Sequence, residues 1–244
     1  MGKNMAKALS NLHTQNLRYE RKFVYPNVDP EDLIATEILT NSFCFREIYQ
    51  RRTINNCYFD DSSMSSYHQN VAGDEKRNKY RLRWYGDHFS EIVNPIFEIK
   101  KKYGAVGDKL LFPFKNLKIK LETSSSEDLL QTIKETAKKN NFDALAIALN
   151  LLRPSLYNFY ERRYFHSHCK KFRITIDYNL QFYNPVMDKH TLTRRRFNDV
   201  IIELKYTRDH DKEARSLSQE LSARLTKHSK YVRGIDCINH VQHT

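Results

Sequence analysis

The chain has 244 residues, of which 40% are hydrophobic and 12% are aromatic, so it can build a large core and is not a disordered protein. Its formal net charge is +12, with 41 Lys and Arg against 29 Asp and Glu. This balance indicates an anionic partner such as nucleic acid, a phosphorylated small molecule, polyphosphate or acidic lipid. The alternative is that the surplus lysines only keep the surface soluble.

The cysteines and the hydropathy pattern exclude further classes of protein. The 4 cysteines are far apart and form no CxxC pair, so neither a disulfide framework nor a zinc site is predicted. We recognise no signal peptide and no apolar run of about 18 residues, which predicts a cytoplasmic protein with reduced thiols and no direct membrane insertion. Any role at a membrane would then need a separate membrane protein as partner.

Strands and short helices alternate in the first half of the chain. Residues 1–15 are polar and are expected to be a flexible N-terminus. A strand over residues 17–24 is followed by a helix that starts at Pro30 and runs to about residue 41, because its apolar residues recur at helical spacing. Asp60 and Asp61 look like a metal-binding pair but are interpreted as a turn and a helix cap. Further extended segments are expected at residues 55–59, 79–85, 95–101 and 109–114.

The second half predicts helices first and then mostly strands. Three serines at 124–126 form an N-cap cluster before a helix that ends near residue 139, and a second helix covers residues 142–151. The strands are joined mainly by turns, which favours an antiparallel sheet in an α+β fold with helices outside. The remaining predicted elements are strands at 155–165, 172–182 and 199–206, and a helix at 212–226. We expect a single domain over residues 16–235 and a C-terminal tail over 236–244.

Basic residues occupy alternate positions on most of the predicted strands. Side chains at i and i+2 point to the same face of a strand, so Arg81 and Arg83 share one face and Leu82 lies on the other. One face of the sheet is therefore predicted to be charged, and the other apolar and covered by helices. The same-face cations are Arg18, Lys22, Arg81, Arg83, Lys100, Arg162, Arg173 and Lys205, and the acidic residues beside them are Glu20, Glu98 and Glu203.

A charged sheet face can be open or enclosed, and the two arrangements predict different partners. An open basic face would bind nucleic acid, normally with aromatic side chains on which bases stack. A face closed on itself would form a tunnel for a compact polyanion, because cations crowded together repel each other strongly. The carboxylates interleaved with the cations favour the tunnel, so nucleic acid is not the expected partner. Arginine binds phosphate oxygens bidentately, and carboxylates suit Mg²⁺ or Mn²⁺ bridging to phosphate.

Seven short motifs place the chain beside a known family. They are Tyr58-Phe59-Asp60, Tyr80 to Gly86, Glu98-Ile99-Lys100, Tyr160-Glu161-Arg162, Phe172 to Asp177, Ile202 to Lys205, and Lys227 to Tyr231. Over roughly residues 16 to 235 the chain resembles the catalytic domain of the vacuolar transporter chaperone (VTC) polyphosphate polymerases, in the triphosphate tunnel metalloenzyme superfamily. The resemblance implies a closed antiparallel β-barrel tunnel. It also implies ATP-dependent extension of inorganic polyphosphate with Mn²⁺ or Mg²⁺.

The resemblance further implies roles for individual residues. The terminal phosphate of the growing chain would attack the γ-phosphate of ATP, and positioning and charge neutralisation would supply most of the catalysis. Glu203 would bind the metal. The catalytic cations would be Lys22, Arg81, Arg83, Lys100, Arg162, Arg173 and Lys205. The other substrate-binding residues would be Arg18, Lys109, Tyr160, Lys227, Ser229 and Lys230.

The chain also departs from the family pattern. The superfamily's hydrolases and cyclases begin with Glu-x-Glu-x-Lys, whereas this chain has Arg18 at the first glutamate, which suits the polymerase branch better. We recognise no phosphate-sensing SPX domain and no membrane helices, which suggests a separately encoded membrane partner at the inner face of a membrane. Two alternatives stay open: a tunnel-type tripolyphosphatase or nucleoside triphosphatase, and a non-catalytic module that binds polyphosphate or RNA.

Overall fold

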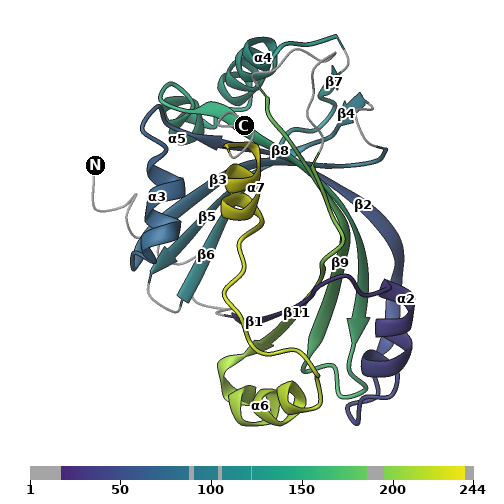
Figure 1. Ribbon diagram of the computed structural model, residues 1–244. Coiled ribbons are helices and arrows are strands. Elements are labelled where there is room, and N and C mark those ends of the chain that lie inside the picture. Colours follow the sequence, from purple (N-terminus) through teal and green to yellow (C-terminus); the bar gives the residue numbers. More distant parts are fainter. Residues whose placement is uncertain (1–17, 88–90, 104–105, 122, 186–194, 240–244) are drawn as a thin grey trace.

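Figure 1 presents a computed structural model, which describes residues 18–87, 91–103, 106–121, 123–185 and 195–239. Within these residues a nine-stranded antiparallel sheet has the order β1-β11-β9-β8-β2-β3-β5-β6, with β10 paired to β9. The bounds are β1 Arg18–Tyr25, β2 Arg46–Asp60, β3 Lys76–Tyr85, β5 Ile96–Tyr103, β6 Val106–Pro113, β8 Arg153–His166, β9 Arg173–Tyr183, β10 Arg195–Phe197 and β11 Val200–Thr207. Two short strands, β4 (Glu91–Val93) and β7 (Lys118–Lys120), form a second sheet. The predicted antiparallel α+β class is confirmed.

Two groups of helices cover the outside of the curled sheet, and two further helices meet at one end of its inner face (Figure 1). Their bounds are α2 Pro30–Leu33, a π-helical turn η1 Ile34–Ile38, α3 Ser65–Ala72, α4 Ser126–Lys139, α5 Asp143–Ala148, a 3₁₀ turn η3 Arg208–His210, α6 Asp211–Gln219 and α7 Lys230–Asn239. Apolar residues of α4 and α5 pack with those of β2, β3 and β5 in one core, while α2, η1 and α6 pack with β1, β9 and β11 in another. Among the described helices, none combines the length and apolar composition needed to cross a bilayer.

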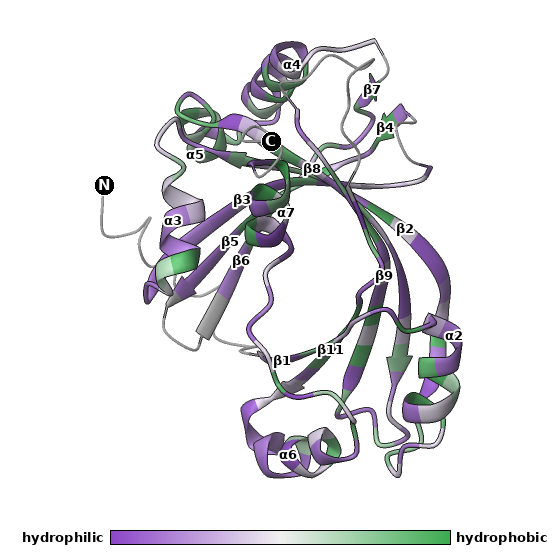
Figure 2. Ribbon diagram, viewed as in Figure 1, coloured by the Kyte–Doolittle hydropathy of each residue, from purple (hydrophilic) through white to green (hydrophobic). Residues whose placement is uncertain are grey.

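The predicted division of the strands into two faces is confirmed. Leu82, Ile174 and Leu204 are fully buried in the cores beneath the outer helices, while their sequence neighbours Arg81 and Arg173 lie on the opposite face. Figure 2 shows the alternation as bands of both colours along β9. We call the face opposite these cores the charged face.

The sheet curls so that its two edge strands approach each other. Cα atoms of β1 and β6 come within 8 Å, and the charged face lies on the inside of the curl (Figure 1). No β1–β6 hydrogen-bond ladder is found in the part of the chain that the structure describes. The closed barrel therefore stays a prediction, although the strands already surround the charged face.

Several predicted elements have different bounds in the structure, and three of these differences have a clear cause. The strand expected at 55–59 begins at Arg46, because its polar first half pairs with β8 through bulges. The helix expected from 30 to 41 is α2 followed by η1, and ends at Ile38. The helix expected at 212–226 ends at Gln219, because the chain then extends across β1. Leu225 bridges Phe23 there, and the Thr226 N–H donates to the Lys22 carbonyl.

Two predicted caps are confirmed by their hydrogen bonds. The Ser125 hydroxyl accepts from the Asp128 N–H and the Asp128 carboxylate accepts from the Ser125 N–H, which forms a capping box at α4. The Asp60 carboxylate accepts from the N–H groups of Ser66 and Tyr67 at the start of α3. Asp60 is therefore a structural residue, as the interpretation of the Asp60-Asp61 pair anticipated.

Helix α7 was not predicted, and it crosses the expected boundary between domain and tail at residue 235. Its residues Tyr231 and Ile235 pack on Leu156 and Phe182, in a third core at one end of the charged face. Gly234 permits this close packing, because a Cβ atom there would lie 2.4 Å from Leu156 Cδ2 and 2.6 Å from Phe182 Cδ1. The domain bounds themselves stay a prediction, and residues 1–15 lie outside the described residues.

Replacing Gly234 tests whether α7 is held by this close contact. We expect Gly234→Ala to lower the free energy of unfolding by about 1–3 kcal/mol through overpacking, measured by chemical denaturation. Without the contact, alanine would instead stabilise the helix by about 1 kcal/mol. The sign of the change in unfolding free energy therefore shows whether the close contact holds α7. Asn239→Ala, at the exposed end of the same helix, is the control and should change stability by less than about 0.5 kcal/mol.

Candidate functional site

Glu203 is the centre of the first cluster on the charged face. Its carboxylate lies 2.8 Å from Lys205 Nζ and 3.3 Å from Lys22 Nζ, on β11 and β1. It also lies 3.4 Å from Arg162 Nη2 on β8 and 3.4 Å from Lys230 Nζ on α7. Burial alone would raise the pKa of Glu203, but the surrounding cations hold it well below its usual range. Four structural elements therefore converge on one ionised carboxylate.

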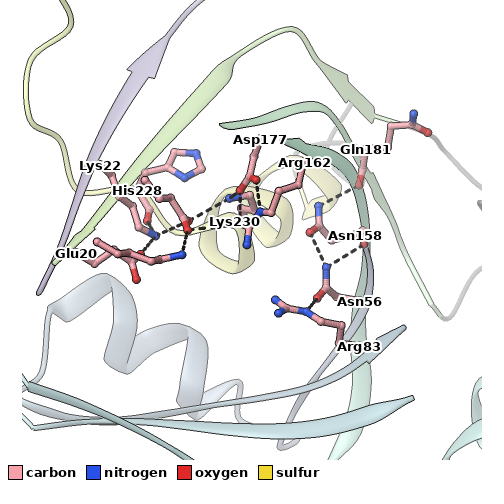
Figure 3. Close-up of polar contacts among 12 residues, drawn as sticks. Glu20, Lys22, Asn56, Arg83, Asn158, Arg162, Asp177, Gln181, His228 and Lys230 are labelled. Carbon is pink, nitrogen blue, oxygen red and sulfur yellow. Dashed lines mark hydrogen bonds and ion pairs between the residues drawn. The ribbon is translucent and has the colours of Figure 1, made fainter. Parts of the chain in front are cut away.

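Asp177 on β9 extends this cluster. Arg162 binds its carboxylate with two guanidinium nitrogens, with Nη2 2.6 Å from Oδ2, and Lys230 Nζ lies 2.5 Å from the same oxygen. Figure 3 shows Arg162, Asp177 and Lys230 meeting where α7 approaches β8 and β9. Tyr160 lies beneath them, with its ring centroid 4.9 Å from Lys230 Nζ and 5.3 Å from Arg162 Cζ. The buried tyrosine thus supports both cations.

A second cluster surrounds Glu98 on β5, which is 3% exposed. Its carboxylate accepts from Arg81 Nε, and it lies 2.5 Å from Lys109 Nζ and 3.6 Å from Arg83 Nη1. Burial acts to raise the pKa of Glu98, but Arg81, Arg83 and Lys109 lower it to about 2. Three adjacent strands, β3, β5 and β6, supply these groups because their residues at alternate positions share one face.

Glu20 joins the two sides of the charged face. Its carboxylate lies 3.0 Å from Lys22 Nζ on the same strand and 3.5 Å from Lys100 Nζ on β5, which is not a neighbour of β1 in the sheet. Burial and Glu203 act to raise the pKa of Glu20, but Lys22 and the other lysines lower it to about 2. This ion pair across the curl shows that the charged side chains point toward one another.

A chain of buried amides runs beside the clusters. Arg83 Nε donates to Asn56 Oδ1 at 3.3 Å, Asn56 Nδ2 donates to Asn158 Oδ1 at 3.4 Å, and Asn158 Nδ2 donates to the Gln181 carbonyl at 3.2 Å. Figure 3 shows these side chains along the inner side of β2, β8 and β9. They hold the Arg83 guanidinium in place without adding a charge.

Residues 227–229, which precede α7, cross the charged face and contribute to it. We call them the crossing segment. The His228 carbonyl accepts from Lys22 Nζ at 3.0 Å. The Ser229 hydroxyl accepts from the Val232 N–H at 3.3 Å and so caps α7. The same hydroxyl accepts from Lys79 Nζ on β3 at 2.8 Å. Lys227, at the start of this segment, is exposed. The segment is therefore anchored to strands on both sides of the curl.

The structure brings most of the predicted site residues together. Arg173 lies on the same face, but its Nε donates to His166 Nε2 at 3.0 Å and it pairs with no carboxylate among the described residues. Arg18 lies opposite Thr207 in the β1–β11 ladder, and its side chain is outside the described part of the chain. The predicted residues within the two clusters and the crossing segment are Lys22, Arg81, Arg83, Lys100, Lys109, Tyr160, Arg162, Glu203, Lys205, Ser229 and Lys230.

Among the residues of the charged face that were not predicted as site residues are Asp177, Lys79 and Thr175. Asp177 binds Arg162 and Lys230, as described above. Lys79 has no carboxylate within ion-pair distance among the described residues, and burial together with nearby cations holds its pKa well below the usual range. Thr175 is 2% exposed and faces Glu203 in the β9–β11 ladder, and its hydroxyl has no hydrogen-bond partner within the described residues. Lys79 is two positions from Arg81, and Thr175 is two positions from Arg173, so each shares a strand face with a predicted cation. This spacing is the sequence signal that could have identified both residues.

The carboxylates that could hold a divalent metal are few. Glu20 and Glu203 lie near each other, because both contact Lys22 Nζ. The described residues contain no group of three or more His, Cys, Asp or Glu side chains suited to a metal ion. Mg²⁺ commonly binds one or two carboxylates and completes its shell with water and substrate phosphates. The donor set thus fits a metal shared with a phosphate ligand, and it does not fit an all-protein cage.

Comparison with known proteins gives one family and several distant structures. The model of the VTC domain matches residues 10–239. No curated protein matches the chain. A proposed adenylyl cyclase from Hippeastrum, HpAC1, described as having a dominant triphosphatase activity, has 10% identity and a TM-score of 0.49, covering 90% of this chain and 95% of that chain.

Two further solved structures are similarly distant. The PH1819 protein from Pyrococcus horikoshii OT3 has 11% identity and a TM-score of 0.44, covering 90% of this chain and 99% of that chain. A proposed adenylate cyclase from Bacillus halodurans has 13% identity and a TM-score of 0.47, covering 88% of this chain and 94% of that chain. The family match spans nearly all the described elements, from before β1 to the end of α7. The chain belongs to the VTC domain family, as its seven motifs predicted.

Proposed function

We propose that this protein is a polyphosphate polymerase that transfers the γ-phosphate of ATP onto a growing polyphosphate chain. Family membership supports a site that handles triphosphate groups. The observation that carries the proposal is the cluster around Glu203, where Lys22, Lys205, Lys230 and Arg162 meet one carboxylate. Cations so concentrated suit a ligand with about one negative charge per phosphate, which would replace part of the carboxylate contacts.

The residues of the charged face would act mainly by orienting and neutralising phosphates. Arg81, Arg83 and Arg162 offer planar guanidinium groups for bidentate contacts with phosphate oxygens. Lys22 and Lys205 would neutralise non-bridging oxygens on the transferred group. Such fixed charges stabilise a transition state because they need not reorganise while charge moves from the attacking to the leaving oxygen. No covalent nucleophile from the protein is required.

The proposed metal would be held by Glu203 and Glu20 together with phosphate oxygens. When bound, Mn²⁺ or Mg²⁺ supplies Lewis-acid neutralisation of phosphate charge. Lys22 contacts both carboxylates and would neutralise phosphate oxygens beside them. The metal, the nucleotide, the polymer and a membrane partner remain proposals, as does a position at the inner face of a membrane.

Product analysis tests the reaction itself. We expect the protein to convert ATP, with Mn²⁺, into ADP and an acid-stable polymer, and Arg162→Met to lower polymer formation at least about 100-fold because a transition-state contact is lost. Arg163→Met is the matched control, since the neighbouring side chain lies on the other face with Glu47 and Glu31. Release of orthophosphate without polymer would identify a hydrolase, and ligand binding without turnover would identify a non-catalytic module.

Thr175→Val tests whether the buried hydroxyl serves a phosphate ligand. A buried hydroxyl without a partner destabilises the free protein, so the isosteric valine should raise the free energy of unfolding by about 1 kcal/mol. The same variant should bind tripolyphosphate about tenfold more weakly, because the hydroxyl can no longer donate to a phosphate oxygen. Calorimetric titration and thermal unfolding measure the two effects. Unchanged binding by a stabilised variant would show that the hydroxyl has no role in the site.

Lys109 predicts a pH dependence for anion binding. Burial lowers the pKa of Lys109 to about 8, Glu98 opposes this shift, and Arg81 adds to it. Because an anion favours the protonated lysine, affinity for tripolyphosphate should fall as the pH rises through about 8, by up to about tenfold for each unit above it. Lys109→Arg stays charged and should have a flatter profile. Equal slopes for the wild type and this variant would assign the titration to another group.

A further inference from the structure

Arg52 lies among three tyrosine rings where β2, β3 and β8 run side by side. Its guanidinium carbon is 5.1 Å from the ring centroid of Tyr49, 5.6 Å from that of Tyr164 and 5.9 Å from that of Tyr85. Tyr49 and Tyr164 also contact each other edge to face, with centroids 5.7 Å apart. Within the described residues, Arg52 forms no ion pair with a carboxylate. We call these four residues the Arg52 cluster.

The Arg52 cluster lies on the charged face, beside the cations proposed to bind phosphate. Arg52 stands opposite Arg162 in the β2–β8 ladder, and directly opposed residues in antiparallel strands point to the same side. Tyr85 follows Arg83 at the next alternate position of β3. The rings therefore continue the same surface outward from Arg162 and Arg83.

Two of the three rings of the Arg52 cluster are exposed to solvent, and Tyr164 is partly buried. Tyr49 is 50% exposed and Tyr85 is 46% exposed, and Arg52 is exposed with them. A polyphosphate chain can accept hydrogen bonds from tyrosine hydroxyls, but it has no aromatic surface that could stack on the rings. A nucleobase has such a surface, and bases stack on aromatic rings and on the plane of an arginine guanidinium.

We propose that the Arg52 cluster is a stacking subsite for the base of a nucleoside triphosphate whose phosphates lie against Arg162 and Arg83. The proposal rests on the proposed function, in which ATP is the phosphate donor, and adds where the base of that nucleotide is bound. Because every base has a π-face, this subsite tolerates different bases and selects for the presence of a base.

The cluster also gives the bound nucleotide a direction. Lys79 lies six positions before Tyr85 on the same strand, which places them about 20 Å apart. Lys79 contacts Ser229 at the start of α7, without a carboxylate partner among the described residues. The base would therefore lie at the Tyr85 end of the charged face and the phosphate chain would run toward the Lys79 end.

Removing one ring without changing charge tests the subsite. Tyr85→Leu should weaken ATP binding roughly 5- to 100-fold, the range for loss of one base–aromatic stack, while tripolyphosphate binding stays within about twofold of the wild type. Calorimetric titration of each variant with ATP and with tripolyphosphate measures both. Tyr19→Leu is the matched control, because Tyr19 stacks on Tyr206 on the opposite face of the sheet. The double variant Tyr49→Leu/Tyr85→Leu should widen the difference between the two ligands.

Three results would overturn the proposed stacking subsite. Equal weakening of both ligands would mean that Tyr85 only supports the phosphate clamp, and unchanged ATP binding would mean that no base stacks there. A wild type that binds tripolyphosphate but not ATP would also refute it. A wild type that binds ATP through Tyr85 but forms no polymer would refute the polymerase function and leave the subsite standing.

Discussion

The compensation of crowded cations by buried carboxylates is the constraint on which this structure depends. The cations on the inside of a curled sheet repel one another, and this repulsion grows as water is excluded. Glu203, Asp177, Glu98 and Glu20 offset it by contacting two to four cations each. These contacts also hold the carboxylates ionised, since the pKa values of all four are lowered despite burial. The site is thus stable without a ligand and still rich in positive charge.

The crossing segment and the start of α7 connect the strands on the two sides of the charged face. Lys230 binds Asp177 and Glu203, while the preceding Ser229 contacts Lys79 on the far side of the curl. Close packing at Gly234 fixes the helix that carries them. A shift of α7 would therefore disturb charge compensation as well as packing. The proposed phosphate contacts and metal site depend on this positioning, because Lys230 of α7 contacts both Asp177 and Glu203.

Much of the site could be predicted from alternation along individual strands. Arg81, Arg83 and Glu98 share the charged face because side chains alternate with a period of two, which is a local property. Asp177 and Lys79 obey the same rule, but their importance came from partners on other strands and on α7. The Arg52 cluster was missed because the first half of β2 has bulges and no apolar alternation. The early end of the predicted 212–226 helix has a similar cause, since contacts with β1 outweighed helical spacing.

The sequence by itself determined the family, the antiparallel α+β class, the apolar and charged faces, and most of the cations on the charged face. These follow from short motifs and from periodicities that span only neighbouring residues. Only the tertiary structure decided which carboxylate holds which cation, that α7 packs at one end, and that three tyrosines gather around Arg52. Those features depend on strand register, bulges and the curl of the sheet, which bring together residues that no local pattern connects.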